Sequence, residues 1–224
     1  MSIARQLQDI WNELPVHVRL VAVSKFHPAE MLLEAYHAGQ KIFGESKVQE
    51  LTTKYEVLPK DIEWHFIGHL QTNKIKYIAP FVSMIHSIDS INLLQEVDKY
   101  AGRAGRKINV LLQIHIAKEE TKYGFSENEC YEFLASGAHK NLNNINICGL
   151  MGMATFTEDI NIVRPEFKGL FSFFHQLKQN FFSSDAQFSE LSMGMSEDYH
   201  IAMEEGSTLV RIGSKIFGER QYYS

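Results

Sequence analysis

A lysine at the end of an apolar run is the first residue whose position in the sequence suggests chemistry. In RLVAVSKFHP, residues 19–28, the run Leu20 to Val23 is typical of a buried strand, and Lys25 follows at its carboxyl end. Side chains alternate along a strand, so Val21, Val23 and Lys25 share one face. A lysine is almost never buried without a partner or a role. The pattern therefore predicts a functional amine that continues a row of buried valines.

Small polar residues gather in two segments near the end of the sequence. The segments LSMGMSEDYH and EEGSTLVRIGSKIFGER supply Ser192, Gly194, Ser196, Gly206, Ser207, Thr208, Gly213 and Ser214. Glycine lets backbone amides approach a phosphate closely, and serine or threonine hydroxyls donate further hydrogen bonds. A phosphate site is one interpretation of this pattern, and ordinary turn glycines and helix caps are the other.

Arg211, within the last apolar run, is a second cation with a notable position. On a period of two it shares a face with Leu209 and Gly213. If the runs are strands of one barrel, Arg211 and Lys25 project into the same mouth, and no paired carboxylates stand beside them in the sequence. Two such cations favour an anionic ligand. The alternative is an arginine that reaches the rim or forms a structural ion pair.

The elements that must position these residues alternate along the chain. The predicted strands are 19–26, 41–46, 63–70, 83–89, 107–117, 144–154, 188–196 and 208–218; the predicted helices are 1–15, 29–39, 47–58, 72–81, 91–105, 127–140, 164–181 and 197–206. This alternation favours parallel strands covered by helices, and a compact (β/α) barrel places its chemistry at the carboxyl ends of the strands. An open doubly wound sheet is the alternative, although the dinucleotide fingerprint GxGxxG is absent.

Composition argues against several classes of partner. The chain has 224 residues, of which 45% are hydrophobic and 22% charged, and its formal net charge is −5, so neither nucleic acid nor an anionic membrane is expected as a partner. The basic cluster GRAGRK is interpreted as a solvated turn. Two cysteines are too few for a disulfide framework, and no apolar run has the length of a membrane span or forms a signal-peptide core. We therefore expect a cytoplasmic protein, and a monomer because no long apolar stripe is left exposed.

Other motifs carry less information. His65 and His69 in WHFIGHLQ would share one face of a strand, but a metal site would need further ligands that the spacing does not supply. We interpret them as structural or cofactor-adjacent histidines and predict no metal site. The segment GLMGMATF is typical of core packing by methionine. The motifs HExxH, GxSxG and CxxC and the P-loop are absent.

Seven segments taken together resemble one protein family. In order along the chain they read AVSKFHP, FGESKVQEL, WHFIGHLQTNK, HSID, GLMGMA, LSMGMSEDY and GSTLVRIGSKIFGER. They are similar to the YggS/PROSC family of pyridoxal 5′-phosphate (PLP) binding proteins, from about Val21 to Arg220. The resemblance implies one domain over residues 1–224. That domain would be a fold-type III (β/α)8 barrel of the TIM type with an extra N-terminal helix, similar to the barrel domain of alanine racemase without that enzyme's second domain.

The resemblance also implies roles for individual residues. Lys25 matches the lysine that forms a Schiff base with the PLP aldehyde, and Arg211 matches the arginine that faces the pyridine nitrogen. The matches to the phosphate-binding region are Ser207, Thr208, Gly213 and Ser214, and Ser192 and Met193 are expected to line it. No catalytic residue is implied.

The function implied by the resemblance is PLP homeostasis. The protein is expected to hold PLP on Lys25 and to deliver it to PLP-dependent apo-enzymes. A PLP-dependent amino-acid racemase is the alternative, and a barrel that binds another phosphorylated metabolite without imine chemistry is a third reading. An arginine beside the pyridine nitrogen and the expected lack of a second domain favour holding over turnover.

Two segments differ from the family pattern. The family typically reads FGENYVQE, and here Ser46 and Lys47 replace the asparagine and tyrosine. We expect Lys47 to be exposed and the shorter Ser46 to lose a contact towards the lysine or the cofactor. In ETKYGF, Lys122 matches a lysine that could take part in cofactor transfer, and bulky Tyr123 follows it.

Overall fold

Strands that are neighbours in the sequence are neighbours in space, and the last strand pairs back with the first. The computed structural model describes residues 2–118 and 123–218. Within them the strands form a closed barrel in chain order, and each pairing is parallel. The strands are β1 (Arg19–Val23), β2 (Ile42–Glu45), β3 (Glu63–Phe66), β4 (Met84–Ile88), β5 (Ile108–Ile114), β6 (Ile145–Gly152), β7 (Glu190–Met195) and β8 (Leu209–Ile212). The prediction of a (β/α)8 barrel is confirmed.

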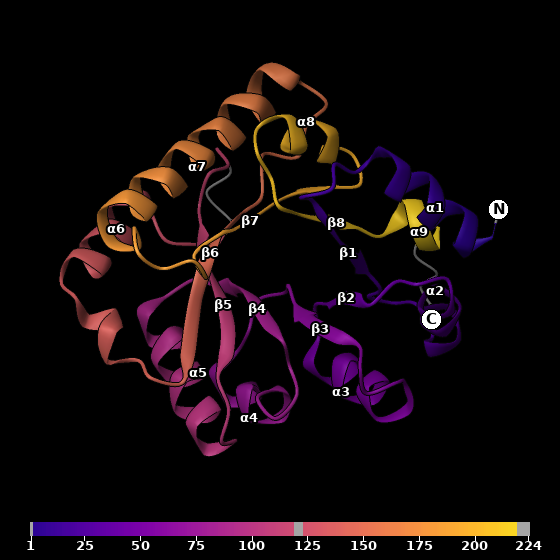
Figure 1. The fold of residues 1–224 in the computed structure, drawn as a ribbon, viewed down its shortest axis with the longest axis horizontal. Helices are drawn as coiled ribbons and strands as arrows, with labels where there is room; N and C mark the ends of the chain where they lie inside the picture. Colours follow the sequence, from indigo (N-terminus) through magenta and orange to yellow (C-terminus); the bar gives the residue numbers. More distant parts are fainter. Residues whose placement is uncertain (1, 119–122, 219–224) are drawn as a thin grey trace.

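Helices surround this barrel, as Figure 1 shows. They are α1 (Ile3–Glu13), α2 (Ala29–His37), α3 (Val48–Val57), α4 (Ile75–Ile78), α5 (Ile91–Arg103), α6 (Glu127–Ala135), α7 (Ile160–Phe181), α8 (Tyr199–Glu204) and α9 (Ser214–Phe217), with 3-10 turns at Thr72–Lys74 and Ala138–Asn141. Helix α1 precedes β1 and packs beside α2 and α9. Its buried residues Ile3, Leu7 and Ile10 recur at helical spacing on one face. The predicted extra N-terminal helix is therefore present.

Two layers of apolar side chains explain why the strands read as nearly continuous hydrophobic runs. Strands buried on both faces need apolar residues at successive positions. The outer layer fills the space between strands and helices. The inner cluster consists of Val21, Met84, Leu111, Cys148, Met151 and Leu209. This inner cluster fills the barrel, and in barrels of this type ligands bind at the carboxyl ends of the strands.

The predicted strands were longer than the observed ones at their carboxyl ends. The predicted strand 63–70 ends at Phe66, and the predicted strand 208–218 ends at Ile212 and is followed by α9. The residues beyond the strand ends form loops at the mouth of the barrel. The predicted helix 127–140 also breaks, because Gly137 adopts a φ of 74° that ends the helix.

The described part of the chain contains no helix that is long and apolar enough to cross a membrane.

Candidate functional site

Lys25 lies two residues after the end of β1, in the turn that leads to α2. Val21 belongs to the inner cluster, which places the odd-numbered side chains of β1 on the lumen side. Lys25 is half-buried and its neighbour Ser24 is fully buried. Phe26 has a φ of 68°, in the left-handed region that non-glycine residues rarely adopt. The chain therefore makes a sharp, constrained turn immediately around the lysine.

Arg211 lies on the lumen side of β8, beside β1. It pairs in register with Val21 and follows the inner-cluster residue Leu209 by two positions. Only 4% of Arg211 is exposed. Its Nη1 donates to Ser192 Oγ at 2.5 Å and its Nη2 to the carbonyl oxygen of Gly152 at 3.0 Å. Burial lowers the pKa of Arg211 to about 10, so the guanidinium is still charged at neutral pH.

Neutral groups hold this cation. Ser192 Oγ is 2.9 Å from His86 Nδ1, and His86 Nε2 is 2.9 Å from His65 Nδ1. A guanidinium only donates, so Ser192 accepts from Arg211 and donates its own proton to His86, which then donates to His65. Burial lowers the pKa of His65 to about 3 and that of His86 well below its ordinary value, so both rings are neutral. Within the described residues no carboxylate forms a salt bridge with Arg211.

Bare backbone at the ends of β7 and β8 lies next to the end of β1. A Cβ atom at Gly213 would lie 2.9 Å from the carbonyl oxygen of Val23, two residues before Lys25. The amide of Gly213 donates to Ser196 Oγ at 3.3 Å. Ser214 begins the short helix α9, in which the amides of Ile216 and Phe217 donate to the carbonyl oxygen of Gly213. The amides of Ser214 and Lys215, at the start of the helix, have no acceptor four residues earlier within it. These amides and the hydroxyls of Ser196 and Ser214 form a set of donors suited to a phosphate.

The structure corrects the prediction for Ser207 and Thr208. Both residues precede β8 and lie at its amino end, and the four residues of β8 span roughly 13 Å. Ser207 Oγ lies 2.8 Å from the carbonyl oxygen of Met193, and Thr208 Oγ1 donates to Glu190 Oε2 at 2.9 Å. They are therefore separated from Gly213 and Ser214 by a whole strand, and they stabilise the opposite end of the barrel.

Met193 also departs from its expected position. Its neighbour Ser192 faces the lumen, where it contacts Arg211. Because side chains alternate along β7, Met193 faces outwards and packs in the outer apolar layer. Its side chain does not line the mouth.

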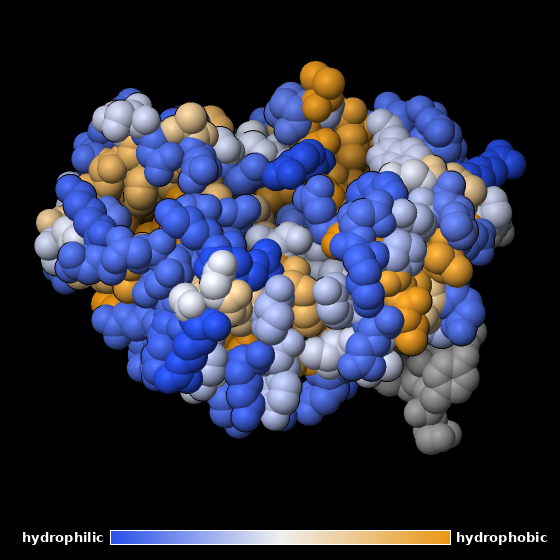
Figure 2. Space-filling model, turned by 60° about the horizontal axis from the view of Figure 1, so that its bottom comes forward, coloured by the Kyte–Doolittle hydropathy of each residue, from blue (hydrophilic) through white to orange (hydrophobic). Residues whose placement is uncertain are grey.

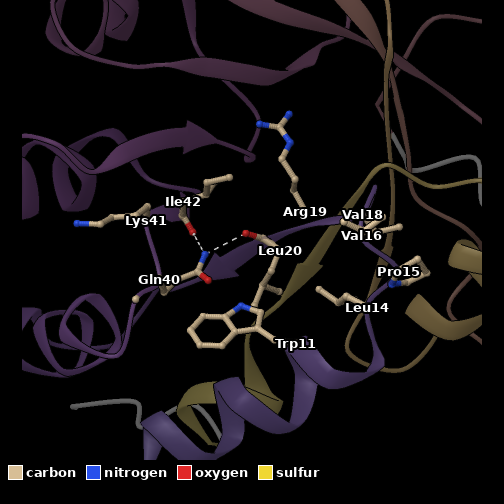
Figure 3. Close-up of a pocket in the computed structure, with 11 residues that line it drawn as sticks. Trp11, Leu14, Pro15, Val16, Val18, Arg19, Leu20, Gln40, Lys41 and Ile42 are labelled. Carbon is tan, nitrogen blue, oxygen red and sulfur yellow. Dashed lines mark hydrogen bonds between the residues drawn. The ribbon is translucent and has the colours of Figure 1, made fainter.

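The barrel bottom contains a hollow of about 360 Å³ between α1 and the start of β1 and β2. Figure 3 shows Gln40 at its centre, where the side-chain amide donates to the carbonyl oxygens of Leu20 and Ile42. Arg19 and Lys41 lie at this end, and each has a carboxylate partner, Glu190 at 2.6 Å for the first and Asp61 at 2.9 Å for the second. The cations of this hollow are therefore compensated within the protein.

Comparison with known proteins decides the family. Residues 2–221 match the model of the alanine racemase N-terminal domain. The chain belongs to this family.

Relatives in this family carry a functional name. The chain is 41% identical over 208 residues to the pyridoxal phosphate homeostasis protein of Aquifex aeolicus, covering 91% of this chain and 88% of that protein. It is 40% identical over 233 residues to the human pyridoxal phosphate homeostasis protein, covering 99% of this chain and 82% of that protein.

Solved structures agree with this assignment. PipY of Synechococcus elongatus PCC7942 superimposes with a TM-score of 0.90 without PLP and 0.87 with PLP bound. The sequence identities are 36% and 35%, and both alignments cover 96% of this chain and 100% of PipY. Alanine racemase of Clostridium difficile shares the fold, with a TM-score of 0.76 at 15% identity, and the alignment covers all of this chain and 56% of the racemase chain.

Two residues at the rim of the mouth, Ser46 and Lys47, differ from the family pattern FGENYVQE. Lys47 is exposed, as expected, and its Nζ lies 4.9 Å from the ring centroid of Phe26. The carbonyl oxygen of Ser46 lies 2.3 Å from where a Cβ at Gly68 would be, so β2 and β3 approach closely here. Lys122 lies outside the described residues.

The two histidines of WHFIGHLQ, His65 and His69, lie in different surroundings. His65 belongs to the buried chain below Arg211, whereas His69 lies beyond the end of β3, where it pairs with Asp89 at 2.9 Å and stacks on Tyr123. The two therefore do not share a strand face. His86 was missed by sequence reasoning, and its signal was a titratable residue in the middle of the predicted strand SMIHSID.

Proposed function

We propose that the protein binds PLP at the barrel mouth, holds it as a Schiff base on Lys25 and supplies it to PLP-dependent apo-enzymes. The observation that carries this proposal is the buried cation Arg211, held by neutral groups and adjacent in register to the strand that leads to Lys25. Asp198 acts on Arg211 electrostatically without forming a salt bridge with it. A buried charge without a counter-charge in direct contact is unfavourable unless a ligand interacts with it. The names of the relatives and the PLP-bound structure of PipY support the same ligand.

The three polar parts of PLP match three parts of the mouth. The phosphate fits the amides around Gly213 and the hydroxyls of Ser196 and Ser214, because a bare backbone can approach its oxygens. The pyridine nitrogen is an acceptor and fits a donor such as Arg211. The aldehyde fits an amine at the end of β1, which is Lys25.

Lys25 is proposed as the covalent ligand. Only an unprotonated amine attacks a carbonyl carbon. The amine nitrogen of Lys25 forms a bond to the aldehyde carbon, two protons leave the nitrogen, and the carbonyl oxygen departs as water. The reaction needs no oxidant or reductant and is reversed by water or by another amine, which suits a protein that must release its ligand.

Arg211 favours holding over turnover. A guanidinium that donates to the ring nitrogen keeps a proton off that nitrogen, and the ring then withdraws electrons less strongly. PLP supplies electron withdrawal to amino-acid chemistry when its ring is protonated. We therefore propose a carrier without amino-acid turnover, in agreement with the names of the relatives.

We further propose that the protein is a monomer in a reducing, cytoplasmic environment. Cys130 and Cys148 are both free and buried. The face in Figure 2 is mostly hydrophilic, and its hydrophobic residues lie in separate patches, which supports a monomer.

Absorbance of the purified protein with PLP tests the proposal. Borohydride should fix the cofactor, and peptide mapping should find it on Lys25. A Lys25→Ala protein that keeps the same reducible adduct at the mouth would refute the assignment of the lysine.

A further inference from the structure

A buried ion cluster lies behind the strand end that carries Lys25. It consists of Glu45, Glu50 and Lys54, and we call it the Lys54 cluster. Lys54 Nζ is 2.7 Å from Glu45 Oε1 and 2.7 Å from Glu50 Oε1. The Glu45 side chain is fully buried and that of Lys54 is 6% exposed. All three residues come from one segment of ten, ESKVQELTTK, which joins the end of β2 to α3.

The cluster contacts the residue on each side of Lys25. Its ammonium donates to the carbonyl oxygen of Ser24 at 2.8 Å, and the Ser24 hydroxyl donates to Glu45 Oε1 at 2.6 Å. On the other side of Lys25, the amide of Phe26 donates to Glu50 Oε1 at 2.6 Å. Hydrogen bonds to charged groups are the stronger ones. The backbone before and after the lysine is therefore fixed to one rigid group.

Strain in the turn explains why such fixing is needed. Phe26 is the single non-glycine residue with a positive φ in the part of the chain that the structure describes. This conformation is unfavourable for a residue with a side chain and persists only where its surroundings hold it. The bond from the Phe26 amide to Glu50 is such a contact.

The cluster lies outside the mouth. Phe43 packs in the outer apolar layer, and Glu45, two residues later on β2, shares that outward face. Gly44 faces the lumen, because a Cβ there would lie 2.9 Å from Val21 Cγ1. The cluster therefore does not line the lumen. It contacts the backbone of the turn that carries Lys25, and it can affect the mouth only through that backbone.

We propose that Glu45, Glu50 and Lys54 are positioning residues that set the place of Lys25 for covalent reaction with PLP. The inference rests on the proposed function. Formation of a bond between an amine and a carbonyl carbon requires the two atoms to be held close and aligned, and small displacements lower the rate strongly. The cluster fixes the backbone on the β1 side of the mouth, beside Gly213 at the end of the neighbouring strand β8.

The test measures where PLP is fixed. Wild type and variants are equilibrated with limiting PLP and reduced with borohydride, and peptide mapping gives the share of fixed PLP on Lys25 against other lysines. Glu50→Ala and Lys54→Met should lower this share at least tenfold. Glu50→Gln, which keeps an acceptor oxygen for Phe26, should stay within threefold of wild type.

A matched control separates positioning from stability. Leu177 is fully buried on α7, and Leu177→Ala should lower the melting temperature while leaving the Lys25 share unchanged. Folded Glu50→Ala or Lys54→Met protein with the wild-type share would overturn the inference. If neither folds, Ser24→Ala removes one hydroxyl of the linkage and should lower the share about threefold, and an unchanged share would overturn the inference.

The result for wild type keeps the two proposals distinguishable. A wild-type protein without PLP on Lys25 would overturn both the proposed function and this inference. A wild-type protein with PLP on Lys25 and cluster variants that match it would overturn the inference alone.

Discussion

The two ends of β8 carry similar residues and serve different purposes. At the amino end, Ser207 and Thr208 bond to carbonyl and carboxylate oxygens of β7, and the nearby cation Arg19 pairs with Glu190. At the carboxyl end, backbone amides begin α9, and the cation Arg211 is held by a hydroxyl and a carbonyl oxygen. Serine and arginine are found at both ends or beside them. A carboxylate in direct contact with the cation, more than residue type, distinguishes the structural end from the end that we propose binds the ligand.

Low pH should destabilise the carboxyl end of β8 most strongly, because His65 and His86 support Arg211 there. The pKa of His65 is lowered from an ordinary 6.5 to about 3, and that of His86 is lowered as well. A depressed pKa gives stability that is complete above 6.5 and is lost as the pH falls, because the unfolded chain binds protons that the folded chain does not. Each histidine should contribute a slope of up to about 1.4 kcal/mol per pH unit.

Urea unfolding of wild type and His86→Gln between pH 7 and pH 5 isolates this slope, because the pKa of Glu45, raised to about 7 by burial, gives the same opposite slope in both proteins. His86→Gln keeps an acceptor for Ser192 and a donor for His65, so the slope should decrease by one proton. A slope that does not change in the variant would mean that His86 is charged in the folded protein.

Replacement of Arg211 and of Arg19, the cations at the two ends of β8, should have different effects on PLP affinity. Arg211→Met should weaken PLP binding by about a hundredfold, because hydrogen bonds to charged groups contribute about 1.5–3 kcal/mol. Arg19→Met, at the other end, should leave PLP affinity within twofold. Absorbance titration with PLP measures both, and equal losses in the two variants would remove the distinction.

Added bulk at Gly213 should have a smaller effect. The new Cβ of Gly213→Ala would press on the carbonyl oxygen of Val23, and we expect about tenfold weaker PLP binding and a loss of about 1–3 kcal/mol of stability. Gly169→Ala is the control, because α7 leaves open space there and alanine should stabilise a helix by about 0.5–1 kcal/mol. Titration and urea unfolding compare the two. Unchanged affinity in Gly213→Ala would remove this backbone from the site.

The smallest effect is expected at Ser207. Ser207→Ala should cost about 1 kcal/mol of stability, since one buried hydroxyl bond is lost, and should change PLP affinity by less than twofold. Ser214→Ala should weaken PLP binding severalfold with little change in stability. A reversed order of the two affinities would restore the phosphate role that the sequence suggested for Ser207.

The fold was predictable because apolar periodicity is a local property. Strands buried on both faces and helices buried on one face repeat in the sequence, and the order of strands follows from the connections. The strand ends were less predictable, because the residues at the mouth after Phe66 and Ile212 are apolar enough to continue a strand pattern. Such loops are shaped by contacts with other strands.

The candidate site was predictable in part. Lys25, Ser192, Arg211, Gly213 and Ser214 lie at the lumen side or the mouth, as strand periodicity indicates. Ser207 and Thr208 were misplaced because the motif GSTLVRIGS is continuous in sequence, but its middle forms β8 and runs from the amino end of the barrel to the carboxyl end. His86, Ser196 and the Lys54 cluster act through partners distant in the chain or on another element. No local sequence pattern predicts such contacts.

Closure of the barrel by pairing of β1 with β8 has a consequence for biosynthesis. Lys25 follows the first strand, and Gly213 and Ser214, the proposed phosphate donors, follow the last, so they meet only after about 190 intervening residues have left the ribosome. A nascent chain that lacks β8 has the lysine without its counterpart. In the proposed function, the complete site for PLP therefore forms only once β8 has paired with β1.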